Sequence, residues 1–332
     1  MRHPAIDGHA DTIERYLADP AGFFGAGRAG HLDAARLRET GQNVQVMAVY
    51  TPPDRSGDTA FRYAVDRIRA YDAVVNAAEN RALQAPWHRI LGRADLERAC
   101  RPGGFGFLLF LEGASPLRGS LDDLERFFAL GVRGLTLTHN HDNEAARGCF
   151  AEGPDAGLTP FGRDLVAALE ALGMAIDLAH ANAAVIRDTL AVARGPVIDS
   201  HTGLRAFHAG SHPHLRARAL GDDEARAIAD TGGVVCIDFI PDHLKGPREP
   251  GSRVGLDDVV EVLRHAVDVA GVDGVGLGSD WDGFGGDPVV GLEDASRLPG
   301  LVAALDAAGF ADDAVAKILG GNLRRALGSV LL

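Results

Sequence analysis

The chain has 332 residues, of which 46% are hydrophobic, and 33 basic side chains stand against 46 acidic ones, for a formal net charge of −13. This length can bury a large core, and barrels of alternating strands and helices often run past about 200 residues as one domain, so we expect a single domain over residues 1–332. The acidic balance argues against nucleic acid and against an anionic membrane as partners, because both need clustered Lys and Arg.

Targeting and cysteine signals are weak. Cys100, Cys149 and Cys236 are far apart and odd in number, so the sequence predicts neither a disulfide framework nor a Cys-x-x-Cys zinc site. The N-terminus passes directly into an apolar run at Ala5, without the pattern of a signal peptide. No apolar stretch is long enough to span a bilayer. We therefore expect a cytoplasmic protein.

Eight short apolar runs are typical of parallel strands that are buried on both faces. The predicted strands are Ala5–His9, Val44–Tyr50, Phe105–Leu111, Gly134–Thr138, Ala175–Ala179, Pro196–Ser200, Gly233–Phe239 and Gly274–Gly278. Between them, apolar residues recur at the three- and four-residue intervals of helices packed on a sheet. The predicted helices are Ala64–Leu83, Leu121–Leu130, Leu165–Leu172, Ala183–Ala193, Asp223–Asp230 and Leu256–Ala270, with long loops at Ala21–Gly30, Ala206–Gly221 and Pro241–Gly255. This alternation predicts an α/β fold, a (β/α)₈ TIM barrel, whose strand ends meet at one face.

A metal-binding pair is predicted after the first strand. His9 and Asp11 lie two residues apart, and alternate residues of an extended segment project to the same side. A His-x-Asp pair alone is a weak signal. Glu112 strengthens it, because a carboxylate after the apolar run Phe107–Leu111 needs a cation or hydrogen bonds to offset its burial. A structural salt bridge is the alternative, but the two oxygens of Glu112 can also bind two ions about 3.5–4 Å apart.

Two histidines, His180 and His201, end consecutive predicted strands, and imidazole is a common neutral ligand of zinc-like ions. A single buried histidine is more often hydrogen-bonded within the core. Two of them at strand ends, in a chain with His9, Asp11 and Glu112, favour metal ligation. Such mixed ligands suit Zn²⁺, and also Mn²⁺, Co²⁺ or Fe²⁺, so zinc is the default expectation.

Asp280 follows the last predicted strand in a glycine-rich segment that lets the backbone approach the barrel interior. It is the best candidate for the base that takes a proton from a metal-bound water. Asp282 has the same orientation by the period of two and is a candidate for substrate binding. A turn-forming role before Gly283 is at least as favoured for Asp282.

Six motifs in this order resemble the membrane (renal) dipeptidases of peptidase family M19. They are Asp-Gly-His-x-Asp at residues 7–11, Leu-Glu-Gly at 111–113, Leu-Thr-Leu-Thr-His at 135–139, Asp-Leu-Ala-His at 177–180, Ser-His at 200–201 and Gly-Leu-Gly-Ser-Asp-Trp-Asp-Gly at 276–283. The resemblance covers nearly the whole chain. It implies a (β/α)₈ barrel of the amidohydrolase superfamily that carries two zinc ions and hydrolyses dipeptides, in many members with a D-residue at the C-terminal position.

The resemblance also implies the metal ligands. His9, Asp11 and Glu112 hold one ion in this pattern, and Glu112, His180 and His201 hold the other, with a hydroxide bridging the two ions. A homodimer is reasonable by the same resemblance.

The roles of other residues follow from the same comparison. Asp280 matches the acid/base of the family, and His139 matches the histidine thought to polarise the substrate carbonyl. The family has Ser-Ser after its strand-six histidine, whereas this chain has Thr-Gly-Leu at 202–204 and then a longer segment. We assign the family's carboxylate-binding arginine to Arg218, with Arg216 as the alternative.

Two other functions are weighed against a dipeptidase. Amidohydrolases that open lactones or cyclic amides commonly use His-x-His and a carboxylated lysine, whereas the single lysine near a strand end here is Lys245. A catalytically silent barrel is the second, with His208, His212 and His214 as a third cation site, although a solvated loop is the favoured interpretation of that cluster. The sequence therefore favours a small dipeptide as the substrate.

Overall fold

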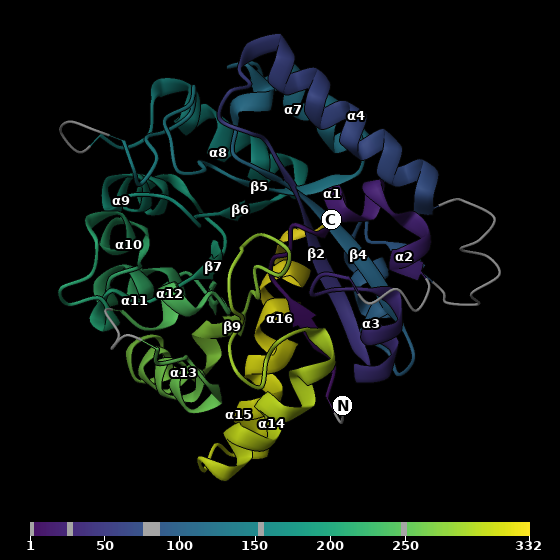
Figure 1. Ribbon diagram of the computed structural model, residues 1–332. Coiled ribbons are helices and arrows are strands. Elements are labelled where there is room, and N and C mark those ends of the chain that lie inside the picture. The colour runs from purple at the N-terminus through teal and green to yellow at the C-terminus, as the bar shows by residue number, and fades with distance from the viewer. Residues whose placement is uncertain (1–2, 25–28, 76–86, 152–155, 247–250) are drawn as a thin grey trace.

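The computed structural model describes residues 3–24, 29–75, 87–151, 156–246 and 251–332, and its strands lie at the centre of a ring of helices (Figure 1). Eight parallel strands form the barrel: β1 (Ala5–Asp7), β2 (Gln42–Tyr50), β4 (Phe105–Glu112), β5 (Val132–Thr136), β6 (Ala175–Asp177), β7 (Ile198–Thr202), β8 (Val234–Ile237) and β9 (Val275–Leu277). They pair in the order β2-β1-β9-β8-β7-β6-β5-β4, and the pairing of β2 with β4 closes the barrel. The predicted (β/α)₈ barrel is confirmed.

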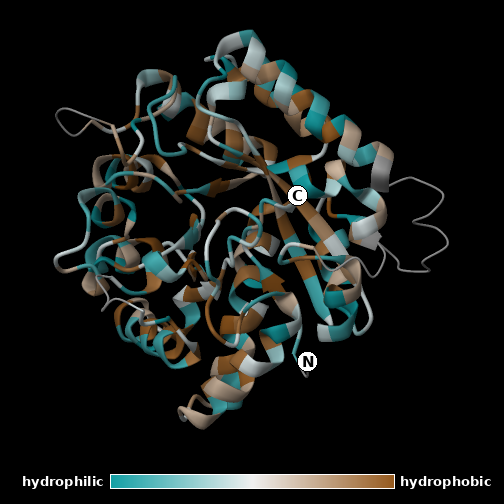
Figure 2. Cartoon of the chain, in the orientation of Figure 1, coloured by the Kyte–Doolittle hydropathy of each residue, from teal (hydrophilic) through white to brown (hydrophobic). Residues whose placement is uncertain are grey.

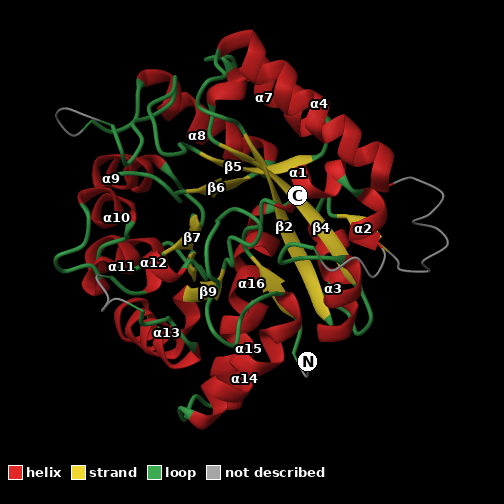
Figure 3. Cartoon of the chain, in the orientation of Figure 1, coloured by secondary structure: helices red, strands yellow, loops and turns green. Residues whose placement is uncertain are grey.

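Helices follow the strands along the chain, and most of them lie around the barrel, whereas α16 (Asn322–Val330) lies near the centre of the view in Figure 3. They are α1 (Thr12–Ala18), α2 (Pro20–Phe24), α3 (Ala34–Thr40), α4 (Gly57–Val75), α6 (Arg93–Ala99), α7 (Leu121–Ala129), α8 (Pro160–Leu172), α9 (Ala183–Val192), α10 (Pro213–Arg218), α11 (Asp222–Asp230), α12 (Pro241–Leu244), α13 (Leu256–Ala270), α14 (Leu298–Ala307), α15 (Asp312–Ala316) and α16 (Asn322–Val330).

Local sequence explains where these helices begin and end. Thr159 caps α8 by accepting a hydrogen bond from the backbone of Gly162, Pro160 occupies the first turn, and Gly173 ends the helix with a φ of 68°. Asn182 caps α9 in the same way, through the backbone N–H of Val185. These are the residue types that satisfy the unpaired backbone groups at helix ends.

The core lies on both sides of the strands. All eight residues of β4 are buried, and the long strands are largely coloured as hydrophobic in Figure 2. One apolar cluster lies between strands and helices, and a second one includes Ile6, Val44 and Leu108 with residues of α16. Burial on two faces explains why the strands are continuous apolar runs rather than alternating ones.

Several predicted boundaries are wrong. β7 covers Ile198–Thr202 rather than Pro196–Ser200, so His201 lies inside the strand. α4 begins at Gly57 rather than Ala64, and positions 76–83 of that predicted helix lie outside the described residues. The predicted loops contain the short helices α2, α10 and α12, which are too brief to show a helical period.

One additional strand, β3 (Trp87–Arg89), was not predicted. It pairs in parallel with Phe105–Phe107 at the start of β4, before β5 joins β4 at Leu109. Three residues without an apolar run carry no strand signal, so only the neighbouring strand identifies this element.

Candidate metal centre and active site

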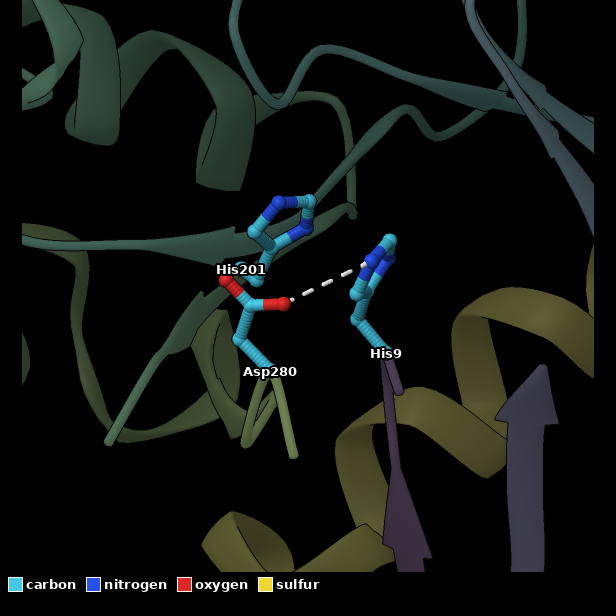
Figure 4. Close-up of side chains that lie close together, drawn as sticks. All are labelled: His9, His201 and Asp280. Carbon is cyan, nitrogen blue, oxygen red and sulfur yellow. Dashed lines mark ion pairs between the residues drawn. The ribbon is translucent and has the colours of Figure 1, made fainter. Parts of the chain in front are cut away.

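The metal-binding residues that the sequence predicts meet at the carboxyl ends of the strands. His9 follows β1, and its Nε2 lies 3.6 Å from Asp11 Oδ2, 3.7 Å from Glu112 Oε1 and 3.8 Å from Asp280 Oδ1. Figure 4 shows His9, His201 and Asp280 grouped around one space. The ligand atoms of His9, Asp11 and Glu112 all lie within 4.8 Å of one another.

Glu112 also joins the second group of predicted ligands. His180 Nε2 lies 3.3 Å from Glu112 Oε1 and 2.9 Å from His201 Nε2, and His201 Nε2 lies 3.7 Å from the same oxygen. Two ligands of a tetrahedral zinc ion lie about 3.4 Å apart, given metal–ligand bonds of about 2.1 Å. The two distances to Glu112 Oε1 are close to this spacing, whereas the 2.9 Å between the two imidazole nitrogens is shorter.

The surroundings of His9 fit a cation. Its side chain is 1% exposed, and neither ring nitrogen has a hydrogen-bond partner within the described part of the chain. Asp11 Oδ1 is also buried without a partner. Burying polar atoms unpaired costs about 1–3 kcal/mol each. A cation bound between these groups would satisfy them.

The two other histidines are held in the tautomer that a metal requires. Asn140 Oδ1 accepts from His180 Nδ1 at 2.8 Å, which leaves His180 Nε2 with its lone pair. Ser200 donates its only hydroxyl proton to Asp177 at 2.6 Å, so its oxygen accepts from His201 Nδ1 at 2.9 Å. His201 Nε2 is therefore also a lone-pair donor. Such supporting hydrogen bonds usually accompany metal-binding histidines.

The pKa values of the clustered side chains also fit a site for cations. Burial, with a smaller contribution from Asp11, raises the pKa of Glu112 to about 8, and burial raises the pKa of Asp280 well above its usual range. Burial works to lower the pKa of His9, but the charges of Glu112, Asp11 and Asp280 outweigh it and raise that pKa to about 10. The cluster therefore has an excess of carboxylates over positive charges, and bound cations would balance it.

Strained backbone marks the site. His180, Asp280 and Asp282 adopt left-handed conformations with φ of 62°, 57° and 67°, which cost about 1 kcal/mol or more for residues other than glycine. This corrects the argument from a period of two, because the segment from Asp280 to Asp282 is a turn and not an extended strand. A side chain at Gly283 would displace two carboxylates of the site, since an added Cβ would lie 2.3 Å from Asp280 Oδ1 and 2.4 Å from Asp11 Oδ2.

A cavity of about 530 Å³ opens onto this cluster, and His139 lines it. His139 Nε2 lies 3.9 Å from Glu112 Oε1, and the ring contacts the edge of Tyr50. Burial, and to a lesser extent the charge of Arg218, lowers the pKa of His139 to about 4. His139 is therefore neutral at pH 7 and can donate a hydrogen bond to a carbonyl oxygen.

Arg218 lines the same cavity, whereas Arg216 is exposed on α10. Arg218 is 5% exposed, and its guanidinium donates to the backbone oxygen of His201 at 2.6 Å and to Thr202 Oγ1 at 3.3 Å. Among the described residues this guanidinium has no ion pair within 4.0 Å, although its charge works to lower the pKa values of the buried carboxyl groups of Asp199 and Glu112. The sequence left Arg216 as the alternative to Arg218 for binding the substrate carboxylate, and the burial of Arg218 on the cavity favours Arg218.

Asp282 borders the cavity, but its carboxylate already has partners. It accepts hydrogen bonds from Thr12 Oγ1 at 2.6 Å, from Arg15 Nε at 3.2 Å and from the backbone of His31 at 2.7 Å. The backbone N–H of Asp282 donates in turn to His31 Nδ1 at 2.9 Å. Sequence reasoning did not find Thr12, Arg15 or His31, because none of them ends a strand.

The residues of the two alternative functions, the histidine cluster and Lys245, do not form a metal site among the described residues. His208 is buried, with Nε2 donating to the backbone oxygen of His243 and Nδ1 beside Ser211 Oγ, whereas His212 and His214 are exposed. These three histidines are in none of the candidate metal groups found among the described residues. Lys245 pairs with Glu261 at 2.6 Å and does not line the cavity.

Imidazoles and carboxylates that converge at the carboxyl end of a parallel barrel are the arrangement expected of a metal-dependent hydrolase with a (β/α)₈ barrel. The family model of the membrane dipeptidases, peptidase family M19, matches residues 1–331. The chain belongs to this family.

Individual relatives agree with this assignment. Dipeptidase AC, a metallopeptidase of family M19, is 26% identical with a TM-score of 0.88, over 100% of this chain and 99% of that one. A metallopeptidase from Rhodobacter sphaeroides, solved with a phosphinate mimic of the dipeptide L-Ala-D-Ala, is 26% identical with a TM-score of 0.87, over 99% of both chains. An uncharacterized dipeptidase of Schizosaccharomyces pombe is 38% identical over 204 residues, which are 60% of this chain and about half, 47%, of that protein.

Within the described residues, no helix has both the length and the apolar character that crossing a membrane requires.

Proposed function

We propose that the chain is a dipeptidase that hydrolyses free dipeptides with two divalent cations, by default zinc. One cation is assigned to His9, Asp11 and Glu112, and the other to Glu112, His180 and His201. When bound, the two ions supply a water of lowered pKa and polarise the scissile carbonyl. The dipeptide mimic bound to the Rhodobacter sphaeroides relative supports this substrate class and makes a D-residue at the C-terminal position a priority for testing.

The observation that carries the proposal is the buried guanidinium of Arg218 on the cavity that also holds the metal cluster. A buried cation without a carboxylate partner is stabilised by an anionic ligand. The free C-terminal carboxylate of a substrate supplies that anion. Because Arg218 and the cluster share one cavity of about 530 Å³, the scissile bond lies close to that carboxylate, which favours dipeptides over longer chains.

The residues of the chain divide the remaining chemistry between them. Asp280 takes a proton from the attacking water and passes it to the departing amine, because it lines the cavity beside the proposed metal ligand His9. Neutral His139 donates a hydrogen bond to the carbonyl oxygen as negative charge develops there. Arg218 binds the C-terminal carboxylate of the substrate, and this contact positions the peptide bond beside Asp280 and His139.

The test is hydrolysis of L-Xaa-L-Xaa and L-Xaa-D-Xaa dipeptides by zinc-loaded protein, together with its metal content. N-acetylated dipeptides, C-amidated dipeptides and tripeptides are the controls. We expect about two ions per chain and cleavage confined to free dipeptides. Protein that holds two ions and cleaves none of the dipeptides would contradict the proposal, and lactones and cyclic amides would be tested next.

A further inference from the structure

A histidine and an aspartate beyond β8 have no role in the mechanism above, although the histidine lines the same cavity. Asp238 follows β8 and is fully buried, and His243 lies in α12. Nδ1 of His243 lies 2.7 Å from Asp238 Oδ2, and Asp238 Oδ1 accepts from the backbone of Ile240 at 3.1 Å. The carboxylate therefore fixes the orientation of the imidazole ring.

The backbone of His243 is held in place as well. Its carbonyl oxygen accepts from His208 Nε2 at 2.8 Å. A Cβ added to Gly203 would lie 2.1 Å from the same oxygen, so α12 packs directly against a glycine. Gly203 belongs to the segment in which this chain has Thr-Gly where the family pattern has Ser-Ser. A serine here would force α12, and His243 with it, away from the barrel.

His243 and Arg218 both contact the segment 201–203 at the carboxyl end of β7. Arg218 donates to the backbone oxygen of His201 and to Thr202 Oγ1, and His243 packs on Gly203. Both side chains line the cavity. Within the described part of the chain, Nε2 of His243 has no hydrogen-bond partner, so it is available to a ligand.

The charges decide what kind of ligand this is. The Asp238 carboxyl group already faces Nδ1 of His243, so Nε2 and the guanidinium of Arg218 are the groups left for a ligand. In its imidazolium form, an imidazole that donates through Nδ1 to Asp238 also donates through Nε2, and a carboxylate has two oxygens to accept hydrogen bonds from it and from Arg218. We propose that His243, oriented by Asp238, binds the C-terminal carboxylate of the substrate together with Arg218. This assignment rests on the proposed dipeptidase function and deepens it.

The test compares the wild type with His243→Leu, which removes the donor, and with Asp238→Asn, which keeps the ring but removes the charge behind it. His265→Gln is the matched control, because His265 pairs with Asp222 at 3.0 Å on the outside of the barrel. The probes are N-acetylglycine and N-acetylglycinamide, which differ only in the carboxylate. Their affinities are measured by calorimetry, and KM and kcat are measured for a cleaved dipeptide.

We expect His243→Leu to weaken N-acetylglycine by about tenfold or more, as loss of a charge-assisted hydrogen bond does, and to leave N-acetylglycinamide unchanged. KM for the dipeptide rises by a similar factor while kcat stays within about twofold. Asp238→Asn shifts the same quantities in the same direction by less, and His265→Gln shifts none of them.

Equal affinities for acid and amide in the wild type, or a His243→Leu protein that retains the full preference for the acid, would overturn the assignment. If His243→Leu does not fold, the same comparison on Asp238→Asn decides. Failure of the proposed function is recognised separately, because it appears as absent dipeptide cleavage by the wild type, whereas the calorimetric preference for a carboxylate is independent of turnover.

Discussion

Thr12 and Asp282 are 270 residues apart in the sequence, and the hydroxyl of Thr12 donates a 2.6 Å hydrogen bond to the carboxylate of Asp282. The contact joins the segment after β1 to the segment after β9. Asp11 immediately precedes Thr12, and Asp280 lies two residues before Asp282. The pair therefore connects the loop of a predicted metal ligand to the loop of the proposed base.

Asp282→Asn tests whether this carboxylate positions its neighbours. We expect kcat to fall about tenfold or more with little change in KM, and metal affinity to fall by about 10–100-fold. The substitution removes the negative charge that pairs with Arg15 and weakens the contacts that hold the two loops together. Thr12→Val removes a single hydrogen bond and should give a smaller change of the same kind. A raised KM with unchanged kcat and metal content would instead favour direct substrate binding by Asp282.

Ser200→Ala tests the hydrogen-bond chain behind His201. Without the hydroxyl, His201 Nδ1 loses its acceptor and Asp177 loses a donor, so we expect metal affinity to fall by about 10–100-fold while the protein stays folded. Competition with a chelator of known affinity measures this change. Thr136→Val is the control, because Thr136 donates to the same carboxylate of Asp177 at 2.6 Å, whereas the hydrogen bond to His201 is made by Ser200. Equal loss in both variants would show a general packing effect.

The barrel and most of the ligand atoms were predictable from the sequence. Strands buried on both faces are continuous apolar runs, and a polar residue such as Glu112 at the end of such a run lies at the carboxyl end of the barrel. His201 was found by the same rule although the strand bounds around it were wrong. The rule tolerates errors of a few residues because it depends on which end of the strand a residue follows.

The supporting residues were not predictable by this rule. Asn140 and Asp177 act through contacts with residues of other strands, such as Asn140 with His180, and no local pattern encodes these pairings. The left-handed conformations of His180 and Asp280 are equally hidden, because His and Asp adopt this region more often than other non-glycine residues but only the packed loops decide at which positions they do so. Tertiary contacts alone define this part of the site.

His139→Gln tests the neutral imidazole through stability in metal-free protein. The unfolded chain protonates His139 near its ordinary pKa of 6.5, whereas the folded protein does so only near pH 4. The stability that neutral His139 contributes is therefore present above pH 6.5 and is lost as the pH falls toward 4. Relative to His139→Gln, the wild type should lose about 1 kcal/mol per pH unit across this range in urea unfolding. A constant difference between the two proteins would show that His139 titrates normally.

Asp280→Asn tests the proton-transfer role most directly. Asparagine keeps the size and one oxygen of the side chain but cannot accept the proton of the attacking water, so we expect kcat to fall by about 10²–10⁴-fold. Asp280 is not among the ligands assigned to either cation, and metal content should stay close to that of the wild type. KM should also change little, because Arg218 and His139 are intact. A variant that holds its metals and keeps near-normal turnover would remove Asp280 from the role of base. Loss of activity together with loss of metal would assign it to the metal centre, where His9, His201 and Asp280 form one of the candidate ligand groups.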